Sequence, residues 1–179
     1  MTIDRHLSLV EEILDTFKDT IGADFLAYKN HVYRVVNLCY AAGVFGAEDK
    51  EKIQIAACFH DLGIWTDATL DYLTPSEEAA ATYLAAVGRK AWTTEVTQMI
   101  EMHHRLRSCK SLTYPLVEAF RRADVADFSL GLFRMGLPKD LILTLKSDFP
   151  NSGFHKRLLQ LGQGWLIAHP RNPFSMFRV

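Results

Sequence analysis

The chain has 179 residues, of which 49% are hydrophobic and 23% are charged, which is the size and composition of an ordinary soluble enzyme of one domain. Its formal net charge of −1 excludes a global attraction to nucleic acid or to an anionic membrane, so any phosphate site must be local. No apolar stretch is long enough to span a membrane, and the first residues lack the pattern of a signal peptide. We therefore expect a cytoplasmic protein that binds neither nucleic acid nor membranes.

Hydrophobic spacing predicts a succession of amphipathic helices separated by short turns. In chain order they cover residues 3–20, 25–42, 47–61, 77–87, 93–103, 115–127, 138–148 and, after a linker at 149–153, a last segment that ends near residue 169. No strand-like alternation is long enough to build a sheet. The fold class predicted is all-α, a helical bundle of about six to eight helices that forms a single domain over residues 1–179, with the apolar tail 173–177 folded back on the body or onto a partner.

Residues typical of helix ends mark several of these boundaries. Asp24 and Ser76 are the residue types expected at N-caps, Gly43 is expected as a left-handed residue after a C-terminus, and the helix 77–87 is expected to end at Gly88. Gly63 is expected to let the backbone leave the third helix at once. The stretch 64–75 is then an irregular aromatic loop, in which Trp65 and Tyr72 either line a substrate pocket or plug the core.

The three cysteines form no CxxC pair, and their odd number argues against a complete disulfide framework. Cys39 and Cys58 lie among apolar residues, where an isolated intracellular thiol usually acts as a small core side chain. We assign them no chemistry.

His60 and Asp61 end the apolar run that begins at Ile53. A buried helix should not end in an imidazole beside a carboxylate unless something compensates both groups. Adjacent helical side chains point about 100° apart, so a cation between them is the simplest compensation. The alternative is a histidine hydrogen-bonded to the neighbouring aspartate.

Further polar residues interrupt apolar helical stripes at His31, at His103 and His104, and at Asp124. The order His, His-Asp, Asp on successive helices resembles the HD-domain superfamily of metal-dependent phosphohydrolases, over about residues 24–130. The segments that carry the resemblance are residues 30–35, 59–63 and 123–127. It implies a metal site made by His31, His60, Asp61 and Asp124, with Asp127 either orienting a ligand or pairing with Arg121 or Arg122.

Other polar residues are candidates for contacts with a substrate. Arg34 lies three residues after His31 on the same helical face, so it could contact an anion, or it could simply extend to solvent. His103 continues the inward face of its helix and His104 lies on the adjacent edge, so one of them should reach the pocket. Arg105 belongs to a basic cluster that serves the site or complements the end of the helix dipole.

Two imidazoles and two carboxylates suit one divalent transition ion, such as Mn, Fe, Co, Ni or Zn, which lowers the pKa of bound water and polarises a phosphoryl, carbonyl or nitrile group. The resemblance implies that the substrate is a nucleotide or another phosphate ester. Many relatives carry Lys or Glu three residues after the paired Asp, where this chain has Ile64. The phrase His60-Asp61-Leu62-Gly63 followed by a hydrophobic residue also looks like the cyanamide hydratase-type branch.

Three functions therefore remain open: a phosphohydrolase in which Asp61, His103 and Arg34 act in catalysis, a small-molecule hydratase or hydrolase, and a non-enzymatic metal- or ligand-binding module. The partner expected is a small molecule, and the sequence leaves open a homo-oligomer. Some relatives bind a second iron through two additional histidines, of which the earlier one has no counterpart in residues 74–79. We therefore predict a single metal.

Overall fold

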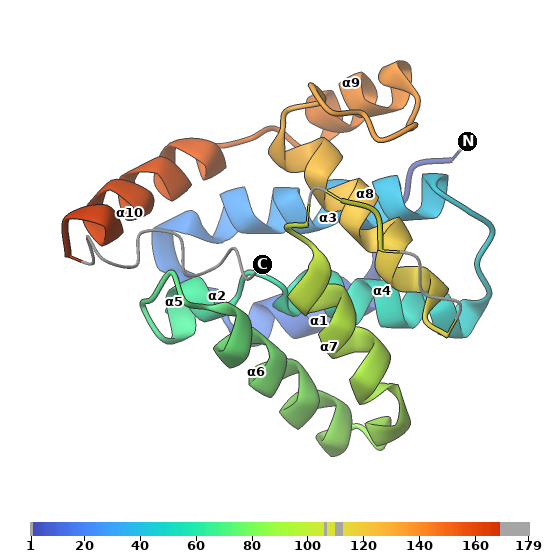
Figure 1. The fold of residues 1–179 in the computed structure, drawn as a ribbon, viewed down its shortest axis with the longest axis horizontal. Coiled ribbons are helices and arrows are strands. Elements are labelled where there is room, and N and C mark those ends of the chain that lie inside the picture. Colours follow the sequence, from blue (N-terminus) through green and yellow to red (C-terminus); the bar gives the residue numbers. More distant parts are fainter. Residues whose placement is uncertain (1, 106, 110–112, 169–179) are drawn as a thin grey trace.

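The computed structural model describes residues 2–105, 107–109 and 113–168, which contain helices and turns and no strand. The all-α prediction is confirmed, and eight of the described helices have nine residues or more. The helices are α1 Ser8–Thr16, α2 Lys18–Ile21, α3 Phe25–Ala41, α4 Ala47–Phe59, α5 Gly63–Thr66, α6 Leu73–Ala86, α7 Thr93–Met102, α8 Pro115–Phe128, α9 Lys139–Asp148 and α10 Phe154–Ala168, with single 3₁₀ turns at Gly22–Asp24 and Lys90–Trp92 (Figure 1).

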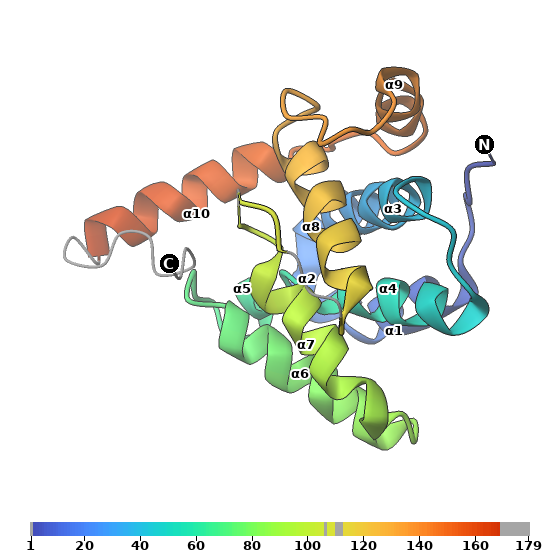
Figure 2. The same cartoon turned by 45° about the vertical axis from the view of Figure 1, so that its right-hand side comes forward.

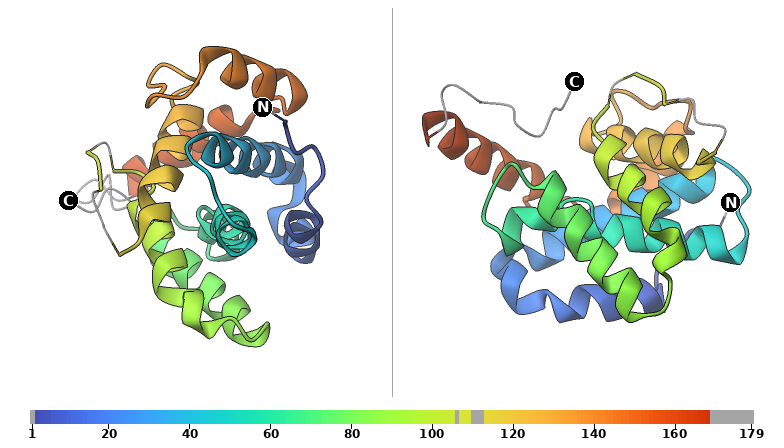
Figure 3. Two further views of the ribbon diagram at one scale, coloured as in Figure 1. Left: turned by 90° about the vertical axis from the view of Figure 1, so that its right-hand side faces the viewer. Right: turned by 60° about the horizontal axis from the view of Figure 1, so that its bottom comes forward.

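Helix α4 lies at the centre of the fold. It packs against α1, α3, α6, α7 and α8, and the left-hand view of Figure 3 looks along it and shows its neighbours around it. Its second half, from Ile53 to Phe59, is buried except at Gln54, as expected for a helix that is apolar on nearly all sides. This central helix delivers His60 and Asp61 into the interior of the protein.

Helices α3 and α8 cross above α4 and pack on each other, whereas α6 and α7 pair on the other side. Helix α10 contacts α3 and projects away from the bundle (Figure 2). Its residues Leu158, Leu161 and Trp165 pack against a small buried cluster that contains Ile64 and Tyr72. None of the described helices is both long and apolar enough to cross a lipid bilayer.

Some predicted helix boundaries and capping roles are wrong, because the residues concerned make tertiary hydrogen bonds instead. The first helix begins at Ser8 rather than at residue 3, since the amides of Asp4 and Leu7 donate to Asn37 Oδ1 and to the Tyr33 hydroxyl. Asp24 stands at the N-cap position of α3, as predicted, but its side chain makes no capping hydrogen bond and instead accepts from Trp65 Nε1 and Arg157 Nε. Gly43 lacks the predicted positive φ, whereas Gly88, which follows the end of α6 as predicted, has a φ of 72°.

Ser76 and Gly63 also differ from their predicted roles, and for one shared reason. Ser76 lies inside α6, where its hydroxyl accepts a hydrogen bond from the Gly63 amide at 3.0 Å. Gly63 does not release the chain from the helix but begins α5, directly against the start of α6. The glycine is required because the two segments approach closely.

Other predictions agree with the structure or fall outside it. Cys39 and Cys58 are free thiols buried in the core, and Pro115 stands in the first turn of α8. The predicted helix end near His169 and the docking of the tail 173–177 lie outside the described residues.

We expect Gly63→Ala to destabilise the fold by about 1–3 kcal/mol, the cost of overpacking a tight contact. A Cβ at this position would lie 2.6 Å from the carbonyl oxygen of Tyr72 and 3.0 Å from Pro75 Cβ, so α6 must move. Urea unfolding would measure the change. Gly162→Ala is the control, because a Cβ there meets nothing within 4 Å and alanine favours a helix; equal stability of the two variants would contradict the prediction.

Candidate metal centre

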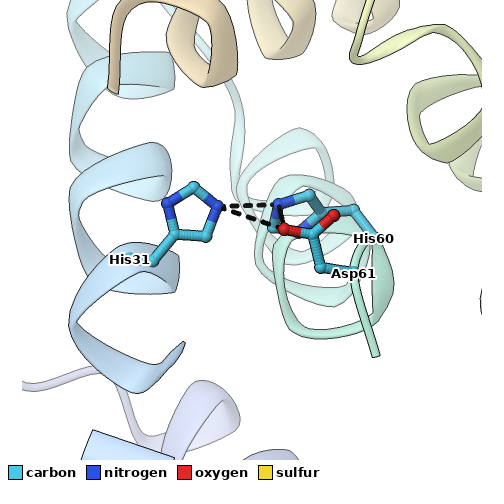
Figure 4. Close-up of side chains that lie close together, drawn as sticks. All are labelled: His31, His60 and Asp61. Atoms are coloured by element: carbon cyan, nitrogen blue, oxygen red, sulfur yellow. Dashed lines mark hydrogen bonds and ion pairs between the residues drawn. The ribbon is translucent and has the colours of Figure 1, made fainter. Parts of the chain in front are cut away.

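Four side chains meet in the interior between α3, α4 and α8. His31 comes from α3, His60 and Asp61 follow α4, and Asp124 comes from α8. All four are at least 96% buried. Figure 4 shows His31 reaching across from its helix toward His60 and Asp61. The structure therefore brings together the four residues that the sequence predicts as metal ligands.

The separations between their donor atoms suit a shared ion. The two Nε2 atoms of His31 and His60 lie 2.9 Å apart, and each lies 3.3–3.6 Å from Asp61 Oδ2 and from Asp124 Oδ1. Ligand atoms held about 2.1 Å from one ion are about 3.0 Å apart at right angles and about 3.4 Å apart at the tetrahedral angle. The residues present thus fit a divalent transition ion.

Hydrogen bonds behind the two imidazoles fix which nitrogen faces the centre. His60 Nδ1 donates to the carbonyl of Ala57 at 2.8 Å, and His31 Nδ1 donates to Asp127 Oδ2 at 2.7 Å. A neutral imidazole protonated at Nδ1 has a bare lone pair at Nε2. Two Nε2 atoms therefore face each other beside two carboxylates, an arrangement that needs a positive charge, either a bound cation or a proton on one ring.

The electrostatics of the centre agree with that requirement. Burial alone lowers the pKa of His60, but the negative charges of Asp61 and Asp124 outweigh it and raise this pKa to about 9. Burial likewise raises the pKa of Asp61, and the surrounding imidazoles reverse this and hold it well below its ordinary value. The centre thus stabilises positive charge at His60 and negative charge at Asp61.

Asp127 orients His31 rather than pairing with Arg121 or Arg122, which bond to Glu118 and to the carbonyl of Met135. Its carboxylate also binds Arg34 at both oxygens, at 2.6 and 2.9 Å. Arg34 donates further to the carbonyl of Phe149. The prediction that Arg34 contacts a substrate anion finds no support here, because its guanidinium is buried behind His31 and neutralised by Asp127.

His103 faces the centre from the end of α7. Its Nδ1 donates to the carbonyl of Ile100, and its Nε2 lies 3.4 Å from Asp61 Oδ1. Both of these facing atoms are buried, and neither has a hydrogen-bond partner within the part of the chain that the structure describes. A substrate or water bound on this side of the centre could therefore form hydrogen bonds with these two atoms.

His104 adjoins His103, with 3.7 Å between the ring centroids. Its Nε2 accepts a hydrogen bond from the Tyr72 hydroxyl. Burial and the neighbouring His103 lower the pKa of His104 to about 3, so it stays neutral. Asp61, His103 and His104 form a second group of three side chains whose metal-ligand atoms lie within 4.8 Å of one another, beside the group of His31, His60 and Asp61.

A cavity of about 500 Å³ opens from this side of the centre and extends under α10. Asp61, Asp124, Tyr72 and His104 line it, which agrees with the pocket interpretation for Tyr72. Trp65 instead lines a separate cavity, stacks at 4.7 Å on Tyr28 and donates to Asp24. Arg105 is exposed and lines neither cavity.

Sequence reasoning missed the side of the cavity that α8 and α10 provide. The residues concerned are Phe128, His155, Leu158, Leu159 and Leu166. On the sequence they form ordinary amphipathic helices, and only Gly162 and Gly164 inside the last helix signal an unusual packing role.

Comparison with protein families matches one model, described as HD domain, to residues 28–131, which is more than half of the chain. Neither the curated proteins nor the solved structures compared with the chain gave a match.

We expect Asp61→Ala to lose most of the bound metal, because one carboxylate ligand is removed and the remaining imidazoles then lack charge compensation. Elemental analysis of the purified protein should give about one divalent ion per chain for the parent. Full occupancy in the variant would contradict the assignment. Two ions per chain in the parent would contradict the single-metal prediction and place the second ion at Asp61, His103 and His104.

Asp127→Asn should weaken metal affinity about tenfold to a hundredfold through the lost support of His31 and cost about 3 kcal/mol of stability by leaving Arg34 buried and unpaired. The hydrogen bond from His31 and the charge of Arg34 outweigh burial and hold the Asp127 pKa below 3.8, so its stabilising contribution exists above that pH and is lost as pH falls further. Acid titration of unfolding free energy should be shallower in the variant. The double variant Arg34→Met/Asp127→Asn should recover stability without recovering metal affinity.

Proposed function

Because this chain belongs to the HD-domain family, we propose that it is a metal-dependent hydrolase whose divalent ion is held by His31, His60, Asp61 and Asp124. The observation that carries the proposal is the pair of imidazole Nε2 atoms 2.9 Å apart, each within 3.6 Å of two carboxylate oxygens. Few arrangements other than a metal centre justify burying these groups together.

The ion would supply Lewis-acid activation of water and of the bond to be cleaved. The protein's own contribution is a base beside it. His103 Nδ1 donates to the carbonyl of Ile100, so the lone pair on its Nε2 points at the site. We assign His103 as the group that accepts the proton of the attacking water, while Asp61 Oδ1, 3.4 Å away, orients that water.

Tyr72 and His104 are placed to bind the substrate's polar group. The Tyr72 hydroxyl donates to His104 Nε2, and both residues line the cavity next to Asp61. Burial and the charge of Asp61 raise the pKa of Tyr72 well above its ordinary value, so the hydroxyl keeps its proton, which the bond to His104 engages, and its oxygen meets the substrate as a hydrogen-bond acceptor.

Two substrate classes are supported by different observations. Family membership favours a nucleotide or another phosphate ester. The cavity favours the second class, an uncharged small molecule that is hydrolysed or hydrated, because Ile64 lines it and its described lining includes neither Lys nor Arg. A binding module without turnover is the remaining candidate. We propose that the protein works in the cytosol on a small molecule, without nucleic acid or membrane.

A substrate panel would separate these candidates. Nucleoside mono- and triphosphates, cyclic nucleotides, alkyl phosphates, cyanamide and simple amides would be incubated with the purified protein and Mn, Co, Ni, Zn or Fe. Turnover of the uncharged compounds with a dependence on added metal is the expected result. Metal binding without turnover of any compound would leave the binding module.

His103→Ala should lower kcat/KM at least a hundredfold on whichever compound is turned over, because a positioned base contributes factors of about 10²–10⁴. Metal content should stay as in the parent, measured by elemental analysis. His6→Ala, at an exposed position, is the matched control. A change within about twofold for His103→Ala would remove it from the mechanism, and loss of an ion would make it a ligand.

A further inference from the structure

We infer that the substrate is an uncharged molecule with one polar reactive group on an apolar body, and that the body binds in the cavity beneath α10. This rests on the proposed metal-dependent hydrolysis and names the substrate class of the same site. The inference rests on the lining of the cavity and on the helix that covers it, and not on the family match or on the metal ligands.

The lining of the cavity is polar beside the metal centre and mainly apolar elsewhere. Asp61, Asp124, Tyr72 and His104 line it beside the centre. The rest of the described lining is mainly aliphatic and aromatic, with Phe128 from α8 and Leu158, Leu159 and Leu166 from α10, and its other polar residues are His155 and Gln163. Its volume of about 500 Å³ is that of a small-molecule site. A ligand that satisfies both regions is amphiphilic, with its polar group toward the metal centre.

The charges around the cavity disfavour an anionic body. Two carboxylates stand at its closed end, and the nearby arginines are occupied elsewhere: Arg34 binds Asp127, and Arg157 lines the other cavity and binds Asp24. No Lys or Arg lines the cavity within residues 2–105, 107–109 and 113–168. A phosphate-rich ligand would therefore lack the cationic groups that normally bind it.

His155, another titratable residue in the lining of the cavity, does not provide a positive charge for a phosphate. His155 Nε2 donates to the carbonyl of Phe128 at 2.8 Å, and its Nδ1 accepts from the Asn151 side chain. Both ring nitrogens are thus engaged in a neutral imidazole. His155 joins the start of α10 to the end of α8 and so fixes the helix that covers the cavity.

Two glycines on α10 provide a matched pair of test positions. Gly162 lines the cavity next to the metal centre, whereas Gly164 lines the second cavity with Trp65 and Trp165. A Cβ at either position meets nothing within 4 Å. Since glycine is unfavourable inside a helix, leucine at either position should preserve folding.

The probes are straight-chain primary amides from butanamide to octanamide, titrated by calorimetry into the metal-loaded and the metal-free full-length protein. We expect Kd to fall about three- to fourfold for each added methylene, and octanamide to bind more tightly than octyl phosphate or AMP. Gly162→Leu should weaken octanamide binding at least tenfold and butanamide binding much less. Gly164→Leu should leave both unchanged, with thermal melts confirming that both variants are folded.

Four outcomes would overturn the inference: no dependence on chain length, tighter binding of AMP than of every amide, loss of binding in Gly164→Leu instead of Gly162→Leu, or a dimer that Gly162→Leu dissociates without any effect on amide binding. The last outcome, seen by sedimentation, would assign the cavity to a second copy of the chain. Failure of the hydrolase proposal is distinguishable, because chain-length-dependent binding without turnover would leave the inference standing and remove only the catalytic function.

Discussion

The structure depends on the meeting of two imidazole nitrogens, His31 Nε2 and His60 Nε2, at 2.9 Å inside the protein. Both Nδ1 atoms donate elsewhere, so the pair needs a positive charge at the Nε2 atoms, which a bound metal ion would supply in place of a proton. The surrounding helices hold this arrangement in advance: α3 supplies His31, the end of α4 is followed by His60 and Asp61, and α8 contributes Asp124. Such a centre couples metal binding to folding, because the unfolded chain has no equivalent site.

The residues of the candidate metal centre could be located from the sequence because each is a polar residue on an otherwise apolar helical stripe. His31, His60, Asp61 and Asp124 all interrupt such stripes, and burial of an unpaired charge is costly enough for the pattern to be informative. The all-helical fold followed from the same periodicity. Helix ends were less predictable, because Asp24 and Ser76 have the residue types of N-caps but bond to partners 41 and 13 residues away.

The partners of the ligands could not be predicted, because helical phase tells which face a side chain occupies but not what lies opposite. Arg34 shares a face with His31, as expected, yet its partner Asp127 is 93 residues away and binds both of them. Helical phase therefore placed Arg34 beside His31 correctly, but it did not reveal that Arg34 pairs with Asp127. Trp65 and Tyr72 are a second example. Both belong to one aromatic segment of the sequence, but they line different cavities on either side of α10.

Substrate choice at this centre is a property of the cavity and not of the ion. Two carboxylates balance a divalent charge, so the loaded centre has little net attraction for an anion unless the walls add positive charge. Ile64 is buried in an apolar cluster with Leu70, Tyr72 and Leu73 and lines the cavity. Leu158, Leu159 and Leu166 of α10 make the facing wall apolar as well. The proposed substrate, recognised by its apolar body, matches this lining, whereas a phosphate ester would find no Lys or Arg among the described residues that line the cavity.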